Sequence, residues 1–322
     1  MYPLYPDTVL HKTNEKAKQY YNTRIRLLIN YFKTLKIVPY LKKHKELKEI
    51  LKPISKYPVI KITNNIYAFS YLSKKLSTKG KLEILSHHYQ YIQKIFPCSN
   101  VGLLFKDGLL CWSETINDDS FAIKLAHNYL EFEGSLALDF YMNEMLIYKL
   151  AFTVAEGESL NVSEPIAIYV TLLQGTIGQM PSITKATKNL QDIIPSTILL
   201  CVLEGIGISL GIKTIVGISS RNQLCYKNEI ASNHYNNYDA FWNSQGAVKM
   251  YNGDYLLSCP VKLKPINLIK AKYRNRTLAK RTKRAEIIGK VYEKFATYLN
   301  KSFITVIQKS SFHSAFVFHL LF

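Results

Sequence analysis

Hydrophobic residues near the N-terminus recur every three to four positions. Across residues 7–57 they return at this helical spacing, for example at Leu47 and Leu51, and lysines fill many of the positions between them. Two such faces on one segment are typical of an amphipathic helix. The same spacing returns over residues 81–96. The pattern therefore predicts a helical region over residues 1–96.

Beyond this region, short apolar runs bounded by turn residues replace the helical spacing. Asp107-Gly108 separates two such runs. Because Asp-Gly is a favoured hairpin turn, we expect a hairpin over Leu103–Trp112. Further strands are predicted for residues 130–141 and 146–154. Together these segments predict an antiparallel meander over residues 101–155.

A strand, a helix and a second strand follow in that order. Residues 165–173 and 212–218 are apolar runs rich in β-branched side chains, which are typical of buried strands. Pro195 suits the first turn of a helix predicted over residues 196–210. A short polar helix is expected at residues 182–193. This order predicts a right-handed βαβ crossover with a parallel strand pair.

A short helix at residues 238–243 and a hairpin with strands at 247–251 and 255–257 complete the predicted sheet. The fold class predicted is α+β, or mixed α/β, with N-terminal helices before a mixed sheet and a basic helix after it. The predicted segments are a helical region at 1–96, an α/β domain at 97–260, a basic C-terminal helix at 261–302 and an apolar tail at 303–322.

The composition adds a strong positive charge to this picture. Lys and Arg number 42 against 23 Asp and Glu, which gives a formal net charge of +19. Such an excess favours contact with polyanions. The segment Lys262–Arg284 holds ten Lys or Arg and no acidic residue. The candidate basic surface within it comprises Lys270, Lys272, Arg274, Arg276, Lys280 and Arg281.

The basic segment also carries apolar residues between its cations, such as Leu268 and Tyr273. An amphipathic cationic helix can lie on an anionic membrane, and it can also neutralise RNA phosphates or contact an acidic protein. A solvated helix packed on the domain is the alternative interpretation. No aromatic RNA-stacking motif accompanies the segment. We therefore expect an anionic membrane surface or an acidic protein as partner, with RNA as a further candidate and no specific DNA; the oligomeric state stays open.

The five cysteines are widely spaced and include no CxxC pair. They indicate buried thiols in a reducing compartment rather than a disulfide framework or a zinc site. The N-terminus lacks the layout of a secretion signal, and no apolar stretch reaches the roughly 18–20 residues that span a bilayer. We therefore expect a cytoplasmic protein, peripheral to the inner membrane if it contacts lipid.

Several short blocks along the chain, taken in their order and spacing, resemble one bacterial family. The blocks include Leu85–Tyr89, Leu172–Gly175, Leu210–Ser219, Tyr238–Trp242 and Gly253–Tyr255. Over residues 50–285 the chain resembles the VirK/YbjX family, a domain of unknown function. The resemblance implies a link to virulence, envelope integrity and resistance to cationic antimicrobial peptides. It implies no catalytic residue, because no settled reaction comes with the family.

The predicted element order is also similar to that of the N-acetyltransferase (GNAT) fold. This likeness implies that acyl-CoA or acyl-carrier protein is the cofactor, bound where the helix after the central strand begins. Here that region is Gln174, Gly175 and Gly178, although the usual glycine signature is incomplete. A transferase of this kind needs a base, and the candidates are Glu133, on a predicted strand, and Asp239. A solvent-facing strand carboxylate and a helix-capping residue are their simpler interpretations.

His87-His88 is the pair that invites a metal interpretation. Adjacent helix positions diverge by about 100°, so we predict a core or interface pair and no metal site. Gly205 and Gly207 fall inside a predicted helix, where close packing accounts for them. Two hypotheses of function therefore stay open. One is an acyltransferase at the cytoplasmic membrane face that acts on an envelope lipid or related amine; the other is a non-enzymatic factor that binds anionic membrane, RNA or an acidic partner.

Overall fold

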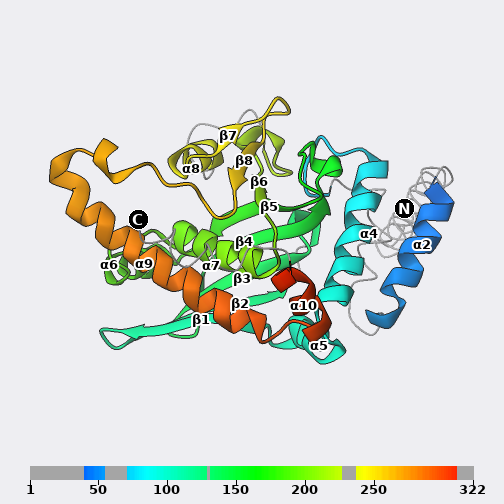
Figure 1. The fold of residues 1–322 in the computed structure, drawn as a ribbon, viewed down its shortest axis with the longest axis horizontal. Helices are drawn as coiled ribbons and strands as arrows, with labels where there is room; N and C mark the ends of the chain where they lie inside the picture. The colour runs from blue at the N-terminus through cyan, green and yellow to red at the C-terminus, as the bar shows by residue number, and fades with distance from the viewer. Residues whose placement is uncertain (1–39, 55–70, 129–130, 227–236, 310–322) are drawn as a thin grey trace, which may run out of the picture.

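The computed structural model of the chain describes residues 40–54, 71–128, 131–226 and 237–309. Within these ranges the fold is α+β, with helices packed around one open mixed sheet (Figure 1). This confirms the predicted fold class. The predictions made for residues 7–39 and 310–322 lie outside the described residues.

Eight strands form the sheet within the described ranges, in the order β1-β2-β3-β4-β5-β6-β8-β7. They are β1 (Leu109–Ile116), β2 (Asp119–His127), β3 (Leu136–Met142), β4 (Met145–Glu156), β5 (Ile166–Gly175), β6 (Thr214–Gly217), β7 (Val248–Lys249) and β8 (Tyr255–Ser258). The pair β5/β6 is parallel and the other neighbouring pairs are antiparallel. The predicted parallel pair and the final hairpin are thereby confirmed.

The described helices surround the sheet. They are α2 (Leu41–Leu51), α4 (Thr78–Ile95), α5 (Cys98–Lys106), α6 (Met180–Asn189), α7 (Pro195–Ser209), α8 (Tyr238–Ser244), α9 (Ala271–Ala296) and α10 (Lys301–Lys309). Helix α7 connects β5 to β6, as predicted for the crossover. In Figure 1, α7 and α9 run side by side across the sheet, while α4 packs against β4 and α2 against α4.

The hairpin predicted over Leu103–Trp112 is wrong. Its first arm belongs to α5, in which Val101, Leu104 and Phe105 are buried at helical spacing. Asp107-Gly108 ends this helix: Gly108 has a φ of +75°, and its N–H donates to the Leu103 carbonyl at 2.9 Å. Asp-Gly therefore forms a helix C-terminal cap here. The cap requires a left-handed backbone, as hairpin turns do, and both structures favour glycine for that reason.

The turns of the meander lie further along the chain. Asn117-Asp118 joins β1 to β2, and Asn143-Glu144 joins β3 to β4. All four residues have φ between 49° and 65°, the backbone of a type I′ hairpin turn. Asn and Asp tolerate this conformation best among residues with a side chain, so the turn chemistry is present in the sequence.

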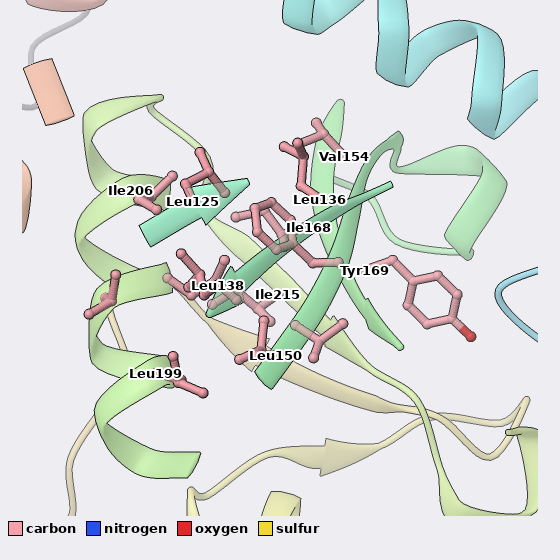
Figure 2. Packing of buried hydrophobic residues seen from close by; sticks show 14 of the residues in the cluster. Leu125, Leu136, Leu138, Leu150, Val154, Ile168, Tyr169, Leu199, Ile206 and Ile215 are labelled. Carbon is pink, nitrogen blue, oxygen red and sulfur yellow. The ribbon is translucent and has the colours of Figure 1, made fainter. Parts of the chain in front are cut away.

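The main hydrophobic core is a continuous cluster that extends from Leu47 on α2 to Leu299 beyond α9. Figure 2 shows part of it, with Leu199 and Ile206 of α7 lying over the sheet residues Leu138 and Ile215. Long consecutive buried runs in β4 and β5 show that both faces of these strands are covered. The centre of the sheet is therefore a rigid support for the loops at its ends.

The two helical glycines allow close packing, as predicted. A Cβ atom on Gly205 would lie 2.9 Å from the Ile288 carbonyl and from Val291 of α9, and one on Gly207 would lie 2.8 Å from the Cys259 sulfur. Helix α9 is also tied to the sheet, because the buried Lys283 ammonium lies 2.6 Å from the Glu114 carboxylate. Among the described helices, none combines the length and the hydropathy that a membrane crossing requires.

Candidate functional site

The parallel strands β5 and β6 stay together for only a few residues. Residues 168–170 pair with 215–217, and the Ile218 N–H still donates to the Val170 carbonyl at 2.9 Å. Beyond that point α8 takes the place of the neighbouring strand: the Leu173 N–H donates to the Tyr238 hydroxyl, also at 2.9 Å. The two strands therefore separate at their carboxyl ends, and α8 fills part of the gap.

A cleft of about 610 Å³ opens at this end of the sheet. Its walls include Glu133 together with Gln174, Gly175 and Gly178, which the sequence had singled out as candidate base and cofactor-binding residues. The structure thus brings residues from two distant segments to one cavity, although their chemical roles stay predictions. Clefts at the carboxyl ends of separating strands are common ligand sites in folds with a parallel pair.

Glu133 does not lie on a strand, contrary to the sequence prediction. It ends a short 3₁₀ helix (Glu131–Glu133) just before β3. Its carbonyl accepts the Thr171 hydroxyl at 2.6 Å, and Thr171 is the extra residue where the β4/β5 register shifts. Bulges of this kind re-aim side chains near functional sites. The next residue must be glycine, because a Cβ on Gly134 would lie 2.8 Å from the Phe152 nitrogen.

Several polar groups face Glu133 across the cleft. The Cys225 thiol lies 3.5 Å from Glu133 Oε1, and Cys225 is exposed. Burial raises the pKa of Tyr238 well above its usual range, and the Glu133 charge raises it further, while hydrogen bonds from Leu173 and Gln223 act the other way. Tyr238 therefore keeps its proton at neutral pH. The cleft holds a carboxylate that can accept a proton and a phenol that can donate one.

A second tyrosine, Tyr148, also lines the cleft. Burial raises the pKa of Tyr148, and a hydrogen bond from Ser196 opposes the rise. Ser196 belongs to the first turn of α7, where Pro195 takes the first helical position and no side chain caps the helix. The N-terminal end of α7 therefore borders the cleft with the positive partial charge of the helix dipole, while the Thr197 and Ile198 N–H groups already donate to the Ile194 carbonyl.

The mouth of the cleft is apolar. Ile177, Met180 and Ile194 line it and are 92%, 69% and 49% exposed. Exposed side chains of this kind, gathered around one opening, indicate a surface that meets an apolar ligand group. Helix α6 carries part of this rim and is held in place by Asp119, which bonds Lys185 and Asn189 at 2.8 Å each.

With the geometry established, comparison with known proteins identifies the family. The model of a family described as “Protein of unknown function (DUF535)” matches residues 12–294. The chain belongs to this family. The uncharacterized protein YbjX of Escherichia coli (strain K12) is 25% identical to it over 237 residues, which cover 70% of this chain and 69% of YbjX. The resemblance to the VirK/YbjX family is confirmed, and no solved structure matches the chain.

Asp239, the second candidate base, does not line this cleft. It lies in the first turn of α8, and its Oδ1 accepts the Ser220 N–H at 3.1 Å. The helix cap is instead Asn237, whose side chain accepts the Ala240 N–H at 2.8 Å. Asp239 therefore joins α8 to the loop after β6 and does not cap the helix, while its role as a base stays a prediction.

Sequence reasoning missed the groups that face Glu133, namely Tyr148, Ser196, Gln223, Cys225 and Tyr238. They come from separate segments, and only the packing of α7 and α8 brings them together. A signal was available for one of them, because Tyr238 opens the block Tyr238–Trp242 on which the family resemblance depends. The expectation that all cysteines are buried is wrong for Cys98 and Cys225, whereas Cys111, Cys201 and Cys259 are buried.

The histidine pair does not converge on one point. His88 is fully buried, and its Nδ1 accepts the Val154 N–H at 3.2 Å. His87 instead stacks on Tyr91, with 5.9 Å between ring centroids. Within the described ranges, no three His, Cys, Asp or Glu side chains come close enough to hold a metal ion.

A second cleft, of about 590 Å³, adjoins the first and shares Ile194 with it. Of the predicted basic surface, Lys280 and Arg281 line this second cleft. Arg276 pairs with Asp192 at 2.7 Å, and Arg274 donates to the Ile269 and Asn267 carbonyls. The basic residues therefore divide between a cavity wall, internal contacts and open surface.

Proposed function

We propose that the chain is a GNAT-like acyltransferase that transfers an acyl group from a thioester donor to an amine or hydroxyl of an envelope lipid or related compound. The observation that carries this proposal is that Glu133 and Tyr238 line the same cleft, where β5 and β6 separate, close enough for the Glu133 charge to raise the Tyr238 pKa. The element order meander, strand, helix, strand, short helix, hairpin supports it. The family resemblance supports a role in virulence, envelope integrity and resistance to cationic antimicrobial peptides.

The chemistry needs two proton transfers, and the cleft offers a group for each. The acceptor nitrogen or oxygen attacks the thioester carbonyl and loses a proton to Glu133, which serves as general base. The carbon–sulfur bond then breaks, the Tyr238 hydroxyl protonates the leaving thiolate, and the proton taken up by Glu133 returns to the Tyr238 oxygen to restore both groups. The raised pKa of Tyr238 keeps that proton in place until it is needed.

The apolar mouth supports a fatty rather than a small polar acyl group. Ile177 is almost fully exposed at this opening, together with Met180. Burying such side chains against an acyl chain is favourable by about 25 cal/mol per Å² of apolar surface. The positive end of the α7 dipole suits the carbonyl and amide oxygens of the acyl donor.

The first test is the thermal stability of the full chain with CoA, acyl-CoAs of increasing length and acyl-carrier protein. A ligand at 100 times its dissociation constant stabilises the folded state by about 2.7 kcal/mol. An acyl donor that binds should then react when an amine acceptor is added, and the reaction is measured as the free thiol released from the donor. Glu133→Gln should lower the rate of release without lowering donor affinity.

A matched control uses an exposed carboxylate that does not line the cleft, Glu158→Gln, which should leave the rate unchanged. If no acyl donor shifts the melting temperature, the transferase proposal fails. If donors bind and Glu133→Gln transfers as fast as wild type, the assignment of the base fails.

A second candidate function is a non-enzymatic factor that binds an anionic membrane. The observation that favours it is the start of α9, where Lys270 and Lys272 are exposed and form no ion pair with a described residue. The preceding Leu268 is 60% exposed. The apolar residues Tyr273 and Leu278 lie five positions apart, about 140° around the helix, so they do not form one continuous stripe. Charge rather than an apolar face would drive this contact.

A further inference from the structure

We propose that the basic cleft beside the N-terminal end of α7 binds the phosphate groups of coenzyme A while the acyl arm of the same molecule occupies the first cleft. This inference rests on the proposed acyl transfer and names the donor. It is carried by the charge that lines the cleft, by the side chains that remain unpaired there and by the continuity of the two cavities.

The walls of the basic cleft come from several parts of the chain, among them the uncharged residues 243–246 at the end of α8. Helix α9 contributes Lys280, Arg281 and Arg284; the segment between β8 and α9 contributes Lys262 and Lys264. The loop between α6 and α7, with Asp192, closes the remaining side. The space of about 590 Å³ is thus lined by five cations. Among the described residues, Asp192 is the one carboxylate in the lining.

That carboxylate is already neutralised from outside the cleft. Asp192 Oδ2 lies 2.7 Å from the Arg276 guanidinium, and Arg276 is not among the lining residues. Lys280 binds the Asp192 backbone carbonyl rather than its carboxylate, at 2.6 Å. Arg284 is in turn opposed by the buried Glu204 carboxylate. The charges of Lys262, Lys264, Lys280 and Arg281 remain in excess, which favours a ligand with several negative charges.

Some of the cations build the walls and others are available. Arg281 donates to the Lys264 carbonyl, which holds the segment before α9 against the helix. Lys280 holds the α6–α7 loop in the same way. By contrast, the Lys262 and Lys264 ammonium groups form no ion pair with any described residue, although both line the cavity. Two ammonium groups without an ion pair, beside further cations, are typical of a phosphate site.

The two cavities meet at the start of α7. Ile194 lines both of them, while Ser196 faces the first cleft and its neighbour Thr197 faces the second. A ligand that crosses Ile194 therefore passes the N-terminal end of α7, where the helix dipole favours an anion although the Thr197 and Ile198 N–H groups donate to the Ile194 carbonyl. An extended molecule with an apolar end and an anionic end matches this order of surfaces.

Coenzyme A fits these surfaces better than the carrier-protein form of the same pantetheine arm. Its diphosphate and 3′-phosphate together carry about four negative charges, against one on the phosphodiester of a carrier protein. Five cations with one neutralised carboxylate exceed what a single phosphodiester requires. The arrangement therefore assigns the nucleotide end of coenzyme A to the basic cleft.

Calorimetric titration of the full chain with CoA and with pantetheine, which lacks every phosphate, tests this assignment. CoA should bind about tenfold or more tightly than pantetheine, and added salt should reduce the difference. The double variant Lys262→Gln/Lys264→Gln should weaken CoA binding by about tenfold and leave pantetheine binding unchanged. The control Lys270→Gln/Lys272→Gln removes the same charge outside the cleft and should not change CoA affinity.

Equal affinity for CoA and pantetheine, absence of CoA binding, or equal loss in both double variants would each overturn the phosphate site. Binding of acyl-carrier protein that the Lys262/Lys264 variant does not weaken, with no CoA binding, would assign the donor to the carrier protein instead. If the acyl group is transferred from acyl-pantetheine as fast as from acyl-CoA, the proposal of a phosphate site is contradicted and the proposal of a transferase stands. If CoA binding depends on Lys262 and Lys264 but no thiol is released, the proposal of a phosphate site stands and the proposal of a transferase is contradicted.

Discussion

The Tyr238 hydroxyl accepts the backbone N–H of Leu173 at 2.9 Å, at the point where β5 has lost its pairing with β6. A buried strand N–H needs a partner, and here a side chain supplies it in place of a neighbouring strand. Tyr238 also lines the first cleft together with Glu133, whose charge raises its pKa. One oxygen thus completes the sheet and serves the candidate site.

Removing this oxygen should affect both roles. Tyr238→Phe leaves the Leu173 N–H without its acceptor, and we expect the free energy of unfolding to fall by about 1–3 kcal/mol in chemical denaturation. Thiol release should fall much further at temperatures where the variant stays folded, because the leaving thiolate loses its proton donor. If the rate changes only in proportion to the folded fraction, Tyr238 is a structural residue alone.

The sheet could largely be predicted from the sequence, because its central strands follow simple patterns. The apolar runs of β5 and β6 and the strong helix opened by Pro195 predict the crossover at nearly the observed positions. The error at Asp107-Gly108 has a specific cause. Glycine with positive φ ends helices and also forms hairpin turns, and the helical spacing of Val101, Leu104 and Phe105 decides between the two.

Gly217 on β6 supports Trp242 of α8, and the contact leaves no room for a side chain. A Cβ atom on Gly217 would lie 2.1 Å from the indole ring, which is fully buried and donates its N–H to the Ile218 carbonyl. Gly217→Ala should therefore destabilise the fold by about 3 kcal/mol or more, since a rigid ring in a packed core cannot give way. Thermal unfolding measures the loss.

The matched control for this substitution is Gly289→Ala. Gly289 lies in α9, and a Cβ atom there would meet nothing within 4 Å. Alanine is the better helix former, so this variant should gain about 0.5–1 kcal/mol. A loss at Gly289 similar to that at Gly217 would show that the contact with Trp242 does not determine the effect.

The candidate site was less accessible to sequence reasoning than the fold. Gln174 and Gly175 follow a strand directly, so the turn at its end can be located from the pattern alone. Glu133 and Tyr238 lie about a hundred positions apart in the sequence. Both are held against the end of β5, Glu133 through its carbonyl on the bulge residue Thr171 and Tyr238 through its hydroxyl on Leu173. Neither feature has a local signal, because both depend on packing between segments.

Glu204 should make stability depend on pH. It is buried in α7, where burial raises its pKa to about 7 from an ordinary value of 4.5, and its Oε1 accepts the Val261 N–H at 2.7 Å. Between these two values the folded chain keeps a proton that the unfolded chain has released. The free energy of unfolding should therefore fall by about 3 kcal/mol as pH rises from 4.5 to 7.

Glu204→Gln isolates this contribution, because the amide keeps an acceptor for Val261 and cannot ionise. The stability of wild type minus that of the variant, measured by denaturation across the range, should decline with rising pH. His88 acts in the opposite direction, since burial lowers its pKa to about 3 and stability is lost as pH falls below 6.5. It is present in both proteins and cancels in the difference. Parallel stability curves would contradict the assignment to Glu204.

If the second candidate function holds, the start of α9 should bind anionic vesicles. Each lysine near such a surface contributes about 1 kcal/mol, so Lys270→Gln/Lys272→Gln should weaken binding to phosphatidylserine vesicles by about tenfold or more at low salt. The control Lys42→Gln/Lys45→Gln removes the same charge from exposed positions on α2. Sedimentation with vesicles separates the outcomes. Equal losses in both variants would indicate attraction by net charge alone, because a defined surface on α9 should respond only to the loss of its own cations.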